Sequence, residues 1–381
     1  MPEDARQTLF DLLDAAVQDG VFPGCIALVS RDDAVVYHEG HGTLGSHPSF
    51  VDRFEPVGRD TAYDLASLTK VLATTTLAAV AVAQGQVELD AGVPEPWSRA
   101  CPGATLADLL EHCAGLEAHR EYFLDVAPFD AEAVLARVCE TPPAAAPRER
   151  AVYSDLGFMI LGAWLERLFD APLDHAFVAR VAYPSWLDQG EPPALAFRRL
   201  HGDAMLPSSL ERLIAPTEVY DAALHPDGVP SHFAVRAHVP VAHGSVHDDN
   251  AYVMGGVAGH AGLFGTAGGV HELARAWLQQ RLPDGAGALR DRFWRASTVP
   301  GSTRRLGWDG AAPDGSGATA DAFGPDAIGH TGYTGTSLWI DPSAARGPLI
   351  CVLLTNRVHP SRTNDAIKAF RQRFHGAAAK L

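Results

Sequence analysis

The chain begins with a pattern that predicts one helix followed by a β-hairpin. Residues 3–19 place apolar side chains on one face of a helix that ends at Gly20. The β-rich runs 25–29 and 34–37 flank the polar residues 31–33, which favours two paired strands joined by a turn. We therefore expect the N-terminal segment to supply a helix and two strands.

From Ala62 to about residue 245 the apolar spacing becomes helical. The predicted helices are separated by proline-rich breaks and cover residues 67–83, 106–112, 131–139 and 156–168. Residues 303–326 are rich in Gly, Ala and Asp and are expected to form an exposed loop.

The C-terminal part returns to a β pattern. Residues 335–340 lead into the turn signal Asp341-Pro342, and the apolar run 349–355 predicts a strand that is covered on both faces. Residues 364–374 then predict a closing helix.

This order of elements predicts the α+β class. We expect an antiparallel sheet built from both chain ends, flanked by terminal helices, with an inserted all-helical domain. The sheet domain is expected to cover residues 1–62 and 246–381, and the helical domain residues 63–245. Because clefts between domains are frequent ligand sites, we expect the active site at their interface.

Composition limits the class of partner. The formal net charge of −16 argues against a nucleic acid or an anionic membrane as partner. No apolar run approaches the ~20 residues that span a bilayer, and the N-terminal residues lack the pattern of a secretory signal, so we expect a cytoplasmic protein. The five cysteines form no C-x-x-C and are expected to be reduced, mostly buried thiols.

The first candidate for chemistry is Ser67-Leu68-Thr69-Lys70. Positions three apart share one face of a helix, so Ser67 and Lys70 can touch. A serine hydroxyl needs an adjacent base or cation to become a good nucleophile. A buried lysine can be partly neutral and accept the serine proton. The chain has only three lysines, and chance would place about 0.13 of them three residues after a serine. The alternative is an ordinary helix with a solvated lysine.

Two further segments could carry polar groups into a cleft. Tyr153-Ser154-Asp155 precedes a predicted helix, and either Ser154 or Asp155 would serve equally well as its N-cap. The segment 330–336, His-Thr-Gly-Tyr-Thr-Gly-Thr, leads into a predicted strand, and its glycines allow a close approach of backbone to ligand. Its alternative is a glycine-rich turn with His330 exposed.

Taken together, these segments resemble the three ordered motifs of serine β-lactamases and low-molecular-weight penicillin-binding proteins. The matching residues are Ser67-x-x-Lys70, Tyr153-x-Asp155 and His330-Thr331-Gly332, and the likeness spans roughly residues 20–375, including 64–70, 109–116 and 255–264. The chain is most similar to the branch of class C β-lactamases, D,D-peptidases and related esterases, which has a tyrosine in the second motif.

The resemblance implies a set of catalytic roles. Ser67 would attack a carbonyl carbon to form an acyl-enzyme, while Tyr153, held in a phenolate-like state by Lys70, would move the proton. The backbone N–H groups of Ser67 and Tyr333 would form an oxyanion hole, in which one donor is worth ~3–4 kcal/mol in other hydrolases. Thr331 and Gly332 would line the substrate, and Asp155 would lie beside its acyl group.

Two residues depart from the family pattern. Asp155 replaces the usual asparagine and cannot donate as an amide does, so its carboxylate is expected to favour the charged form of Lys70. His330 replaces the usual lysine and, as an ordinary histidine, would be charged only part of the time at neutral pH. Recognition of a substrate carboxylate is therefore weakened, and efficient β-lactam hydrolysis is not expected.

Several functions compete at this point. We rank hydrolysis of a small ester or amide first, ahead of a D,D-carboxypeptidase, a D-aminopeptidase or a weak β-lactamase. No cofactor is expected. A metal site is the chemical rival, but its histidines and aspartates follow no recognised ligand spacing; they are His232, His238, His243, His247, Asp248, Asp249 and His260. The alternative outside the enzymes is a catalytically inactive relative that binds a small ligand without turnover.

Overall fold

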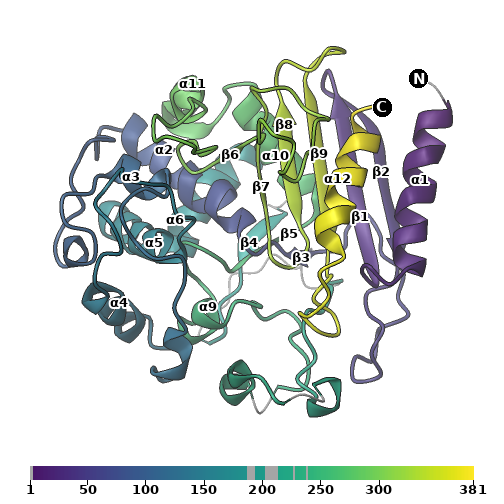
Figure 1. Cartoon of the computed structure of the whole chain (residues 1–381), viewed down its shortest axis with the longest axis horizontal. Helices are drawn as coiled ribbons and strands as arrows, with labels where there is room; N and C mark the ends of the chain where they lie inside the picture. The colour runs from purple at the N-terminus through teal and green to yellow at the C-terminus, as the bar shows by residue number, and fades with distance from the viewer. Residues whose placement is uncertain (1–2, 187–193, 202–212, 226–227, 237–238) are drawn as a thin grey trace.

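The computed structural model describes residues 3–186, 194–201, 213–225, 228–236 and 239–381. His238, one of the histidines considered for a metal site, lies outside these ranges. The element order confirms the predicted α+β class, with strands at both chain ends and helices between them (Figure 1).

The main sheet is antiparallel and has six strands in the order β2-β1-β9-β8-β7-β6. Both chain ends contribute, as predicted, because β9 pairs with β1 on one side and with β8 on the other. Every residue of β9 is buried, which confirms a strand covered on both faces. The strands are β1 Gly24–Arg31, β2 Ala34–Gly42, β6 Asp309–Gly310, β7 Ile328–Thr331, β8 Ser337–Asp341 and β9 Leu349–Thr355.

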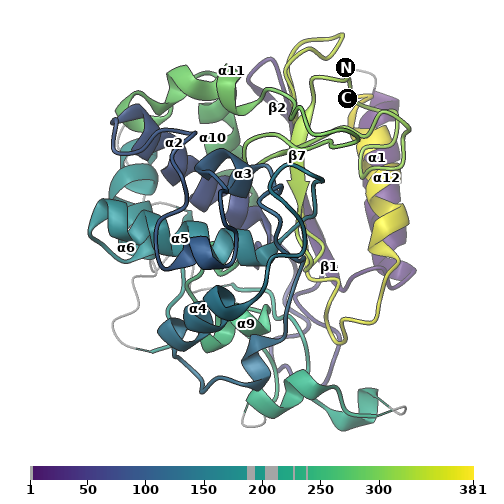
Figure 2. The ribbon, with the colours of Figure 1, turned by 60° about the vertical axis from the view of Figure 1, so that its left-hand side comes forward.

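The two terminal helices cover one face of this sheet. α1 (Glu3–Gln18) and α12 (Ile367–Ala378) lie side by side and form a core with apolar side chains of β1 and β9 (Figure 2). The opposite face packs against α10 (Ala267–Leu278). Burial of these apolar faces is the main force that holds the terminal helices in place.

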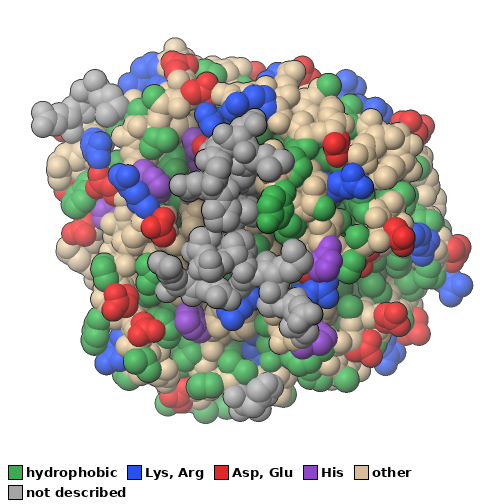
Figure 3. Space-filling model, turned by 180° about the vertical axis from the view of Figure 1, so that it is seen from behind, with side chains coloured by type: hydrophobic (Ala, Val, Ile, Leu, Met, Phe, Trp, Pro, Cys, Tyr) green, Lys and Arg blue, Asp and Glu red, His purple; other side chains and the backbone are tan. Residues whose placement is uncertain are grey.

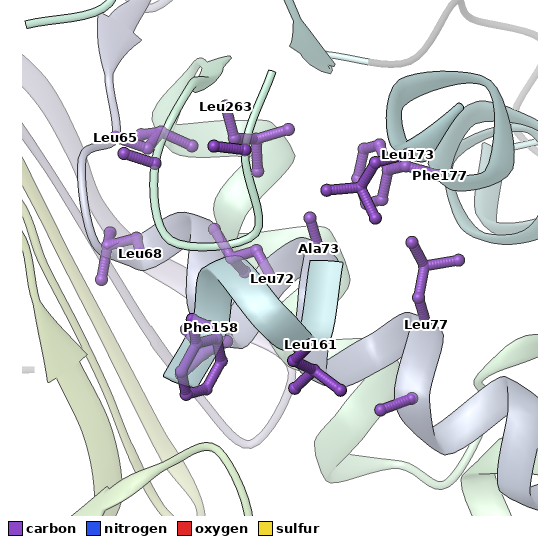
Figure 4. Close-up of a cluster of buried hydrophobic side chains, with 14 of the residues drawn as sticks. Leu65, Leu68, Leu72, Ala73, Leu77, Phe158, Leu161, Leu173, Phe177 and Leu263 are labelled. Atoms are coloured by element: carbon purple, nitrogen blue, oxygen red, sulfur yellow. The ribbon is translucent and has the colours of Figure 1, made fainter. Parts of the chain in front are cut away.

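The helical part surrounds a second core. Apolar side chains from the segment that starts at Leu65, from α5 (Asp155–Phe169) and from α6 (Leu173–Phe177) meet there (Figure 4). The other helices are α2 Thr76–Ala83, α3 Leu106–Leu110, α4 Ala131–Glu140, α7 Tyr183–Trp186, α9 Asp249–Val253 and α11 Arg290–Phe293.

Two predictions about the middle of the chain need correction. Residues 62–245 are not helical to their end, because the described residues after α7 form a short strand, 3-10 turns and irregular segments. A three-stranded sheet, absent from the prediction, joins β3 (Tyr63–Asp64), β5 (Leu263–Gly265) and β4 (Leu195–Phe197). Strands of two or three residues are too short to show an alternating pattern. The proposed domain boundaries stay a prediction.

The segment 303–326 is not the exposed loop that its composition indicates. It contains β6, and the side chains of Leu306, Trp308 and Thr319 are buried. The indole of Trp308 packs edge-on against Trp277 of α10, so a glycine-rich stretch is held by a few large side chains.

The surface carries both signs of charge. On the face shown in Figure 3, acidic and basic side chains alternate with polar and apolar ones. Among the described residues, no helix has the length and apolar character needed to cross a membrane. All five cysteines are free thiols and four are buried, as expected.

Candidate active site

Ser67 lies at the junction between a strand and a helix. β3 ends at Asp64, Ala66 has a φ of 46°, and the helical segment that includes Lys70 follows directly. A positive φ is strained for alanine, and such strain is typical of functional sites. Asp64 fixes this turn because its carboxylate accepts hydrogen bonds from the backbone N–H groups of Ala66 at 2.8 Å and His247 at 2.6 Å.

Lys70 makes the predicted contact with the candidate nucleophile. Its side chain is buried, and Nζ donates to Ser67 Oγ at 2.9 Å, to Asp155 Oδ1 at 2.8 Å and to the carbonyl of His260 at 3.1 Å. Burial lowers the pKa of Lys70, but the negative charge of Asp155 and the nearby Tyr153 outweigh it, so the net direction is upward. Lys70 is therefore an ammonium group at neutral pH.

The Tyr153 side chain is enclosed by cationic and aromatic groups. Lys70 Nζ lies 4.9 Å from the ring centre, and the guanidinium of Arg304 lies 5.0 Å from it. The rings of His112 and His330 pack against it at 4.7 and 5.6 Å between centres. The Tyr153 hydroxyl is buried, and the side chains of Lys70 and Ser67 lie close enough to it to act on its pKa.

The expected phenolate-like state of Tyr153 needs correction. Burial raises the pKa of the Tyr153 hydroxyl, and the opposing effect of the Lys70 charge is smaller. The resting site therefore holds a neutral phenol beside an ammonium group. Sequence reasoning could not weigh these effects, because the depth of burial is a property of the folded chain.

Ser154 and Asp155 have different tasks. Ser154 caps α5, since its side chain accepts a hydrogen bond from the backbone N–H of Gly157, which confirms the capping alternative for this residue. Asp155 is the first residue of the helix, and its carboxylate reaches both Lys70 and His119, with Oδ2 lying 3.3 Å from His119 Nδ1. Burial opposes the charged form of Asp155, but the charge of Lys70 and the hydrogen bond with His119 hold its pKa well below the usual range.

The third motif begins inside a strand rather than in a turn. His330 and Thr331 end β7, and the chain turns back at Tyr333 and Thr334 before β8. His330 is 4% exposed, which argues against the alternative of an exposed histidine in a turn. The expectation of a partly charged imidazole also needs correction. Burial and the nearby charges of Lys70 and Arg304 lower its pKa to about 3, which leaves the imidazole neutral at pH 7.

Gly332 is required where the third motif meets the turn before Ser67. A Cβ at this position would lie 2.1 Å from Thr336 Oγ1 and 2.7 Å from the carbonyl oxygen of Leu65. Thr336 Oγ1 donates to the same Leu65 carbonyl at 3.0 Å. Among the described residues, the backbone N–H groups of Ser67 and Tyr333 donate no hydrogen bond, so both are free to bind an oxyanion.

A cleft of about 690 Å³ joins these groups. All the predicted site residues except the buried Lys70 line it: Ser67, Tyr153, Asp155, His330, Thr331, Gly332 and Tyr333. The cleft also exposes residues that sequence reasoning missed, among them His119, Arg304, Arg371 and Glu121. Arg304 lies in the segment that was expected to be an exposed loop, and no motif singles out the others.

The histidines considered for a metal site that lie in the described ranges have protein partners. His232 Nε2 and His247 Nε2 lie 3.2 and 3.3 Å from Glu218 Oε2, and His260 Nε2 lies 2.9 Å from Asp248 Oδ1. Among the described residues, no group of three or more His, Cys, Asp or Glu is arranged to hold a metal ion.

An antiparallel sheet flanked by helices, a helical insertion and a serine–lysine pair in a cleft define a class of serine hydrolases. Residues 9–373 match the family model described as beta-lactamase, and the chain belongs to this family. A putative D-alanyl-D-alanine carboxypeptidase of Salmonella gallinarum is 29% identical over 397 residues, which cover 93% of this chain and 84% of that protein.

Solved structures show the same fold. EstCE1, described as a hydrolase with promiscuous acyltransferase activity, has a TM-score of 0.68 at 21% identity, covering 98% of this chain and 99% of that one. An octameric penicillin-binding protein homologue from Pyrococcus abyssi has a TM-score of 0.66 at 16% identity, covering 95% and 76%.

Proposed function

We propose that this protein hydrolyses small esters or amides through an acyl-enzyme on Ser67, with esters as the preferred substrates. The observation that carries the proposal is the 2.9 Å hydrogen bond from Lys70 Nζ to Ser67 Oγ at the base of the cleft. Two free backbone N–H groups beside it, those of Ser67 and Tyr333, support an oxyanion hole.

The steps follow from the positions of the groups. Ser67 Oγ forms a bond to the carbonyl carbon, its proton enters the Lys70–Tyr153 pair, and the leaving alcohol or amine takes that proton as its bond to carbon breaks. A water molecule then forms a bond to the acyl carbon and gives a proton to the Lys70–Tyr153 pair. The bond from that carbon to Ser67 Oγ breaks, Ser67 Oγ takes the proton, and the acid leaves. Because Lys70 and Tyr153 both have raised pKa values, acylation depends on the minor form of the pair that has lost one proton. The rate is therefore expected to rise with pH above neutrality.

The test uses p-nitrophenyl acetate and butyrate. Ser67→Ala is expected to abolish turnover, and Tyr153→Phe to lower kcat by about 100-fold or more, as for other lost proton-transfer groups. Ser46→Ala, at an exposed serine outside the cleft, is the control and should keep wild-type turnover. Turnover retained by Ser67→Ala would remove Ser67 from the mechanism.

A peptidase that removes a C-terminal D-amino acid is the second candidate, as in the name of the Salmonella relative. Two cations in the cleft favour it. Arg304 has a single acidic partner among the described residues, Asp309 at 3.3 Å, and Arg371 donates to the carbonyls of Gly332 and Thr336 without an acidic partner among them. Release of D-alanine from a peptide ending in D-Ala-D-Ala, and none from its C-terminal amide, would favour this function.

An inactive relative is separated from both candidates by covalent labelling. A fluorescent phosphonate is expected to label the wild-type protein at Ser67 and to leave Ser67→Ala unlabelled. An unlabelled wild-type protein with an intact fold would favour binding without turnover. Cytoplasmic location remains a prediction.

A further inference from the structure

We infer that His119 is a positioning residue of this hydrolase, which holds the second carboxylate oxygen of Asp155 and so controls how firmly Asp155 binds Lys70. The inference rests on the proposed function. Asp155 forms a bridge, because Oδ1 accepts from Lys70 Nζ at 2.8 Å while Oδ2 lies 3.3 Å from His119 Nδ1. Lys70 is in turn bonded to Ser67, so His119 acts on the nucleophile through two intermediates.

The backbone on both sides of His119 is fixed. The carbonyl of Glu117 accepts from Ser154 Oγ at 2.6 Å, and the carbonyl of Ala118 accepts from the backbone N–H of Asp155 at 2.9 Å. On the other side, Asn250 Nδ2 donates to the carbonyl of Arg120 at 2.7 Å. The start of α5 therefore holds both the carboxylate and the segment that presents the imidazole to it.

His119 is the member of this group that solvent can titrate. Its side chain is 43% exposed at the cleft, whereas that of Asp155 is 17% exposed and that of Lys70 is buried. The hydrogen bond to Asp155, and then the charges of Asp248 and Glu121, raise the pKa of His119 against the effect of burial. The other groups that lower the pKa of Asp155 are Lys70 and His260.

The protonation state of His119 changes how much negative charge Asp155 presents to Lys70. A protonated imidazole shares the carboxylate charge and adds a positive charge near Lys70, so Lys70 gives up its proton more readily. A neutral imidazole that donates from Nδ1 keeps the geometry but leaves the full negative charge of Asp155 on Lys70. Protonated His119 is therefore the form that favours acylation.

Two variants separate geometry from charge. His119→Asn keeps a donor near the position of Nδ1 but cannot be protonated, and His119→Ala removes both. We expect the ratio of His119→Asn to wild-type kcat to be about 0.2 at pH ~5.5 and to approach one at pH ~9. His119→Ala should be about fivefold slow at pH ~9, where only the donor is lost, and slower still at pH ~5.5, where the charge is lost as well. His175→Asn, at an exposed histidine of α6, should follow the wild type at each pH.

A measurement that needs no turnover completes the test. The side-chain titration of His119, followed by NMR and assigned by its loss in His119→Asn, should move to lower pH in Asp155→Asn. If the wild type hydrolyses no ester, the rate of Ser67 labelling by the phosphonate replaces kcat, which separates failure of the proposed function from failure of this inference. An unchanged titration in Asp155→Asn, or wild-type rates in His119→Ala across the pH range, would overturn the inference.

Discussion

One carboxylate determines the protonation state of the buried lysine. Burial alone would favour a neutral amine at Lys70. Its hydrogen bond to the Asp155 carboxylate favours the ammonium form instead. The family's usual asparagine would leave Lys70 without this negative partner. Asp155 therefore stabilises an ammonium group and lowers the population of the deprotonated Lys70–Tyr153 pair at neutral pH.

Asp155→Asn should move the pH dependence of acylation. With the carboxylate removed, the pKa of Lys70 falls, so the rise of phosphonate labelling with pH is expected to occur at lower pH than in the wild type. The measurement is the labelling rate of Ser67 between pH ~5 and ~10. A profile that stays in place would mean that Asp155 does not control Lys70.

At the level of single residues, the sequence predicted partners better than protonation states. The spacing of Ser67 and Lys70 predicted a contact that is present, because positions three apart on a helix must be neighbours. The states of Tyr153 and His330 were predicted wrongly, since they depend on burial by residues distant in the chain. His119 and Arg304 belong to no motif, and only the fold brings them to the cleft.

At the level of elements, the site depends on how closely the segment between β7 and β8 approaches the turn before Ser67. Thr334 Oγ1 donates to the carbonyl of Asp64 at 2.8 Å, and Thr336 Oγ1 to that of Leu65 at 3.0 Å. These two bonds tie the third motif to the residues that precede the nucleophile. Gly332 leaves the room that they need.

Gly332→Ala should therefore damage catalysis through geometry. The new methyl group would displace the Thr336 side chain and weaken its bond to Leu65, so we expect labelling of Ser67 to slow by about tenfold or more and unfolding free energy to fall by about 1–3 kcal/mol. Gly376→Ala is the control, because a Cβ there meets open space within α12 and should leave labelling unchanged. A wild-type labelling rate in Gly332→Ala would show that catalysis does not need this close contact between Gly332 and the turn before Ser67.

Element prediction succeeded where the pattern was long. α1, β1, β2 and β9 were all predicted, since each has enough residues to show its period. β7 was missed because Ile328–Thr331 is short and contains a glycine, and β3 and β6 have two residues each. These strands form through pairing with distant partners, which local propensity does not reveal.

At the level of the whole molecule, buried histidines make stability depend on pH. Burial is the first cause that lowers the pKa of His330 and His375 to about 3 and that of His359 to about 4. An unfolded chain binds these protons near pH ~6.5, so acidification below that value stabilises the unfolded state. Asp64 acts in the opposite direction, because burial raises its pKa to about 6.

We expect the unfolding free energy to fall as the pH is lowered from ~6.5 to ~4.5, by up to about 1.4 kcal/mol per pH unit for each such histidine. Urea denaturation at several pH values measures this slope. His375→Gln keeps a donor for Ser337 Oγ. It should reduce the dependence of unfolding free energy on pH by the contribution of this one histidine. Equal stability at pH ~5 and ~7 would contradict the prediction.

The position of β9 in the sheet has a consequence for synthesis. β9 lies between β1 and β8, yet it consists of residues 349–355 of a chain of 381. The hairpin of β1 and β2 leaves the ribosome before β9, so the edge of β1 that pairs with β9 stays unpaired while the residues between them are made. A nascent chain that stops before Leu349 lacks the strand that joins β1 to β8, and an unpaired apolar strand edge of this kind favours aggregation.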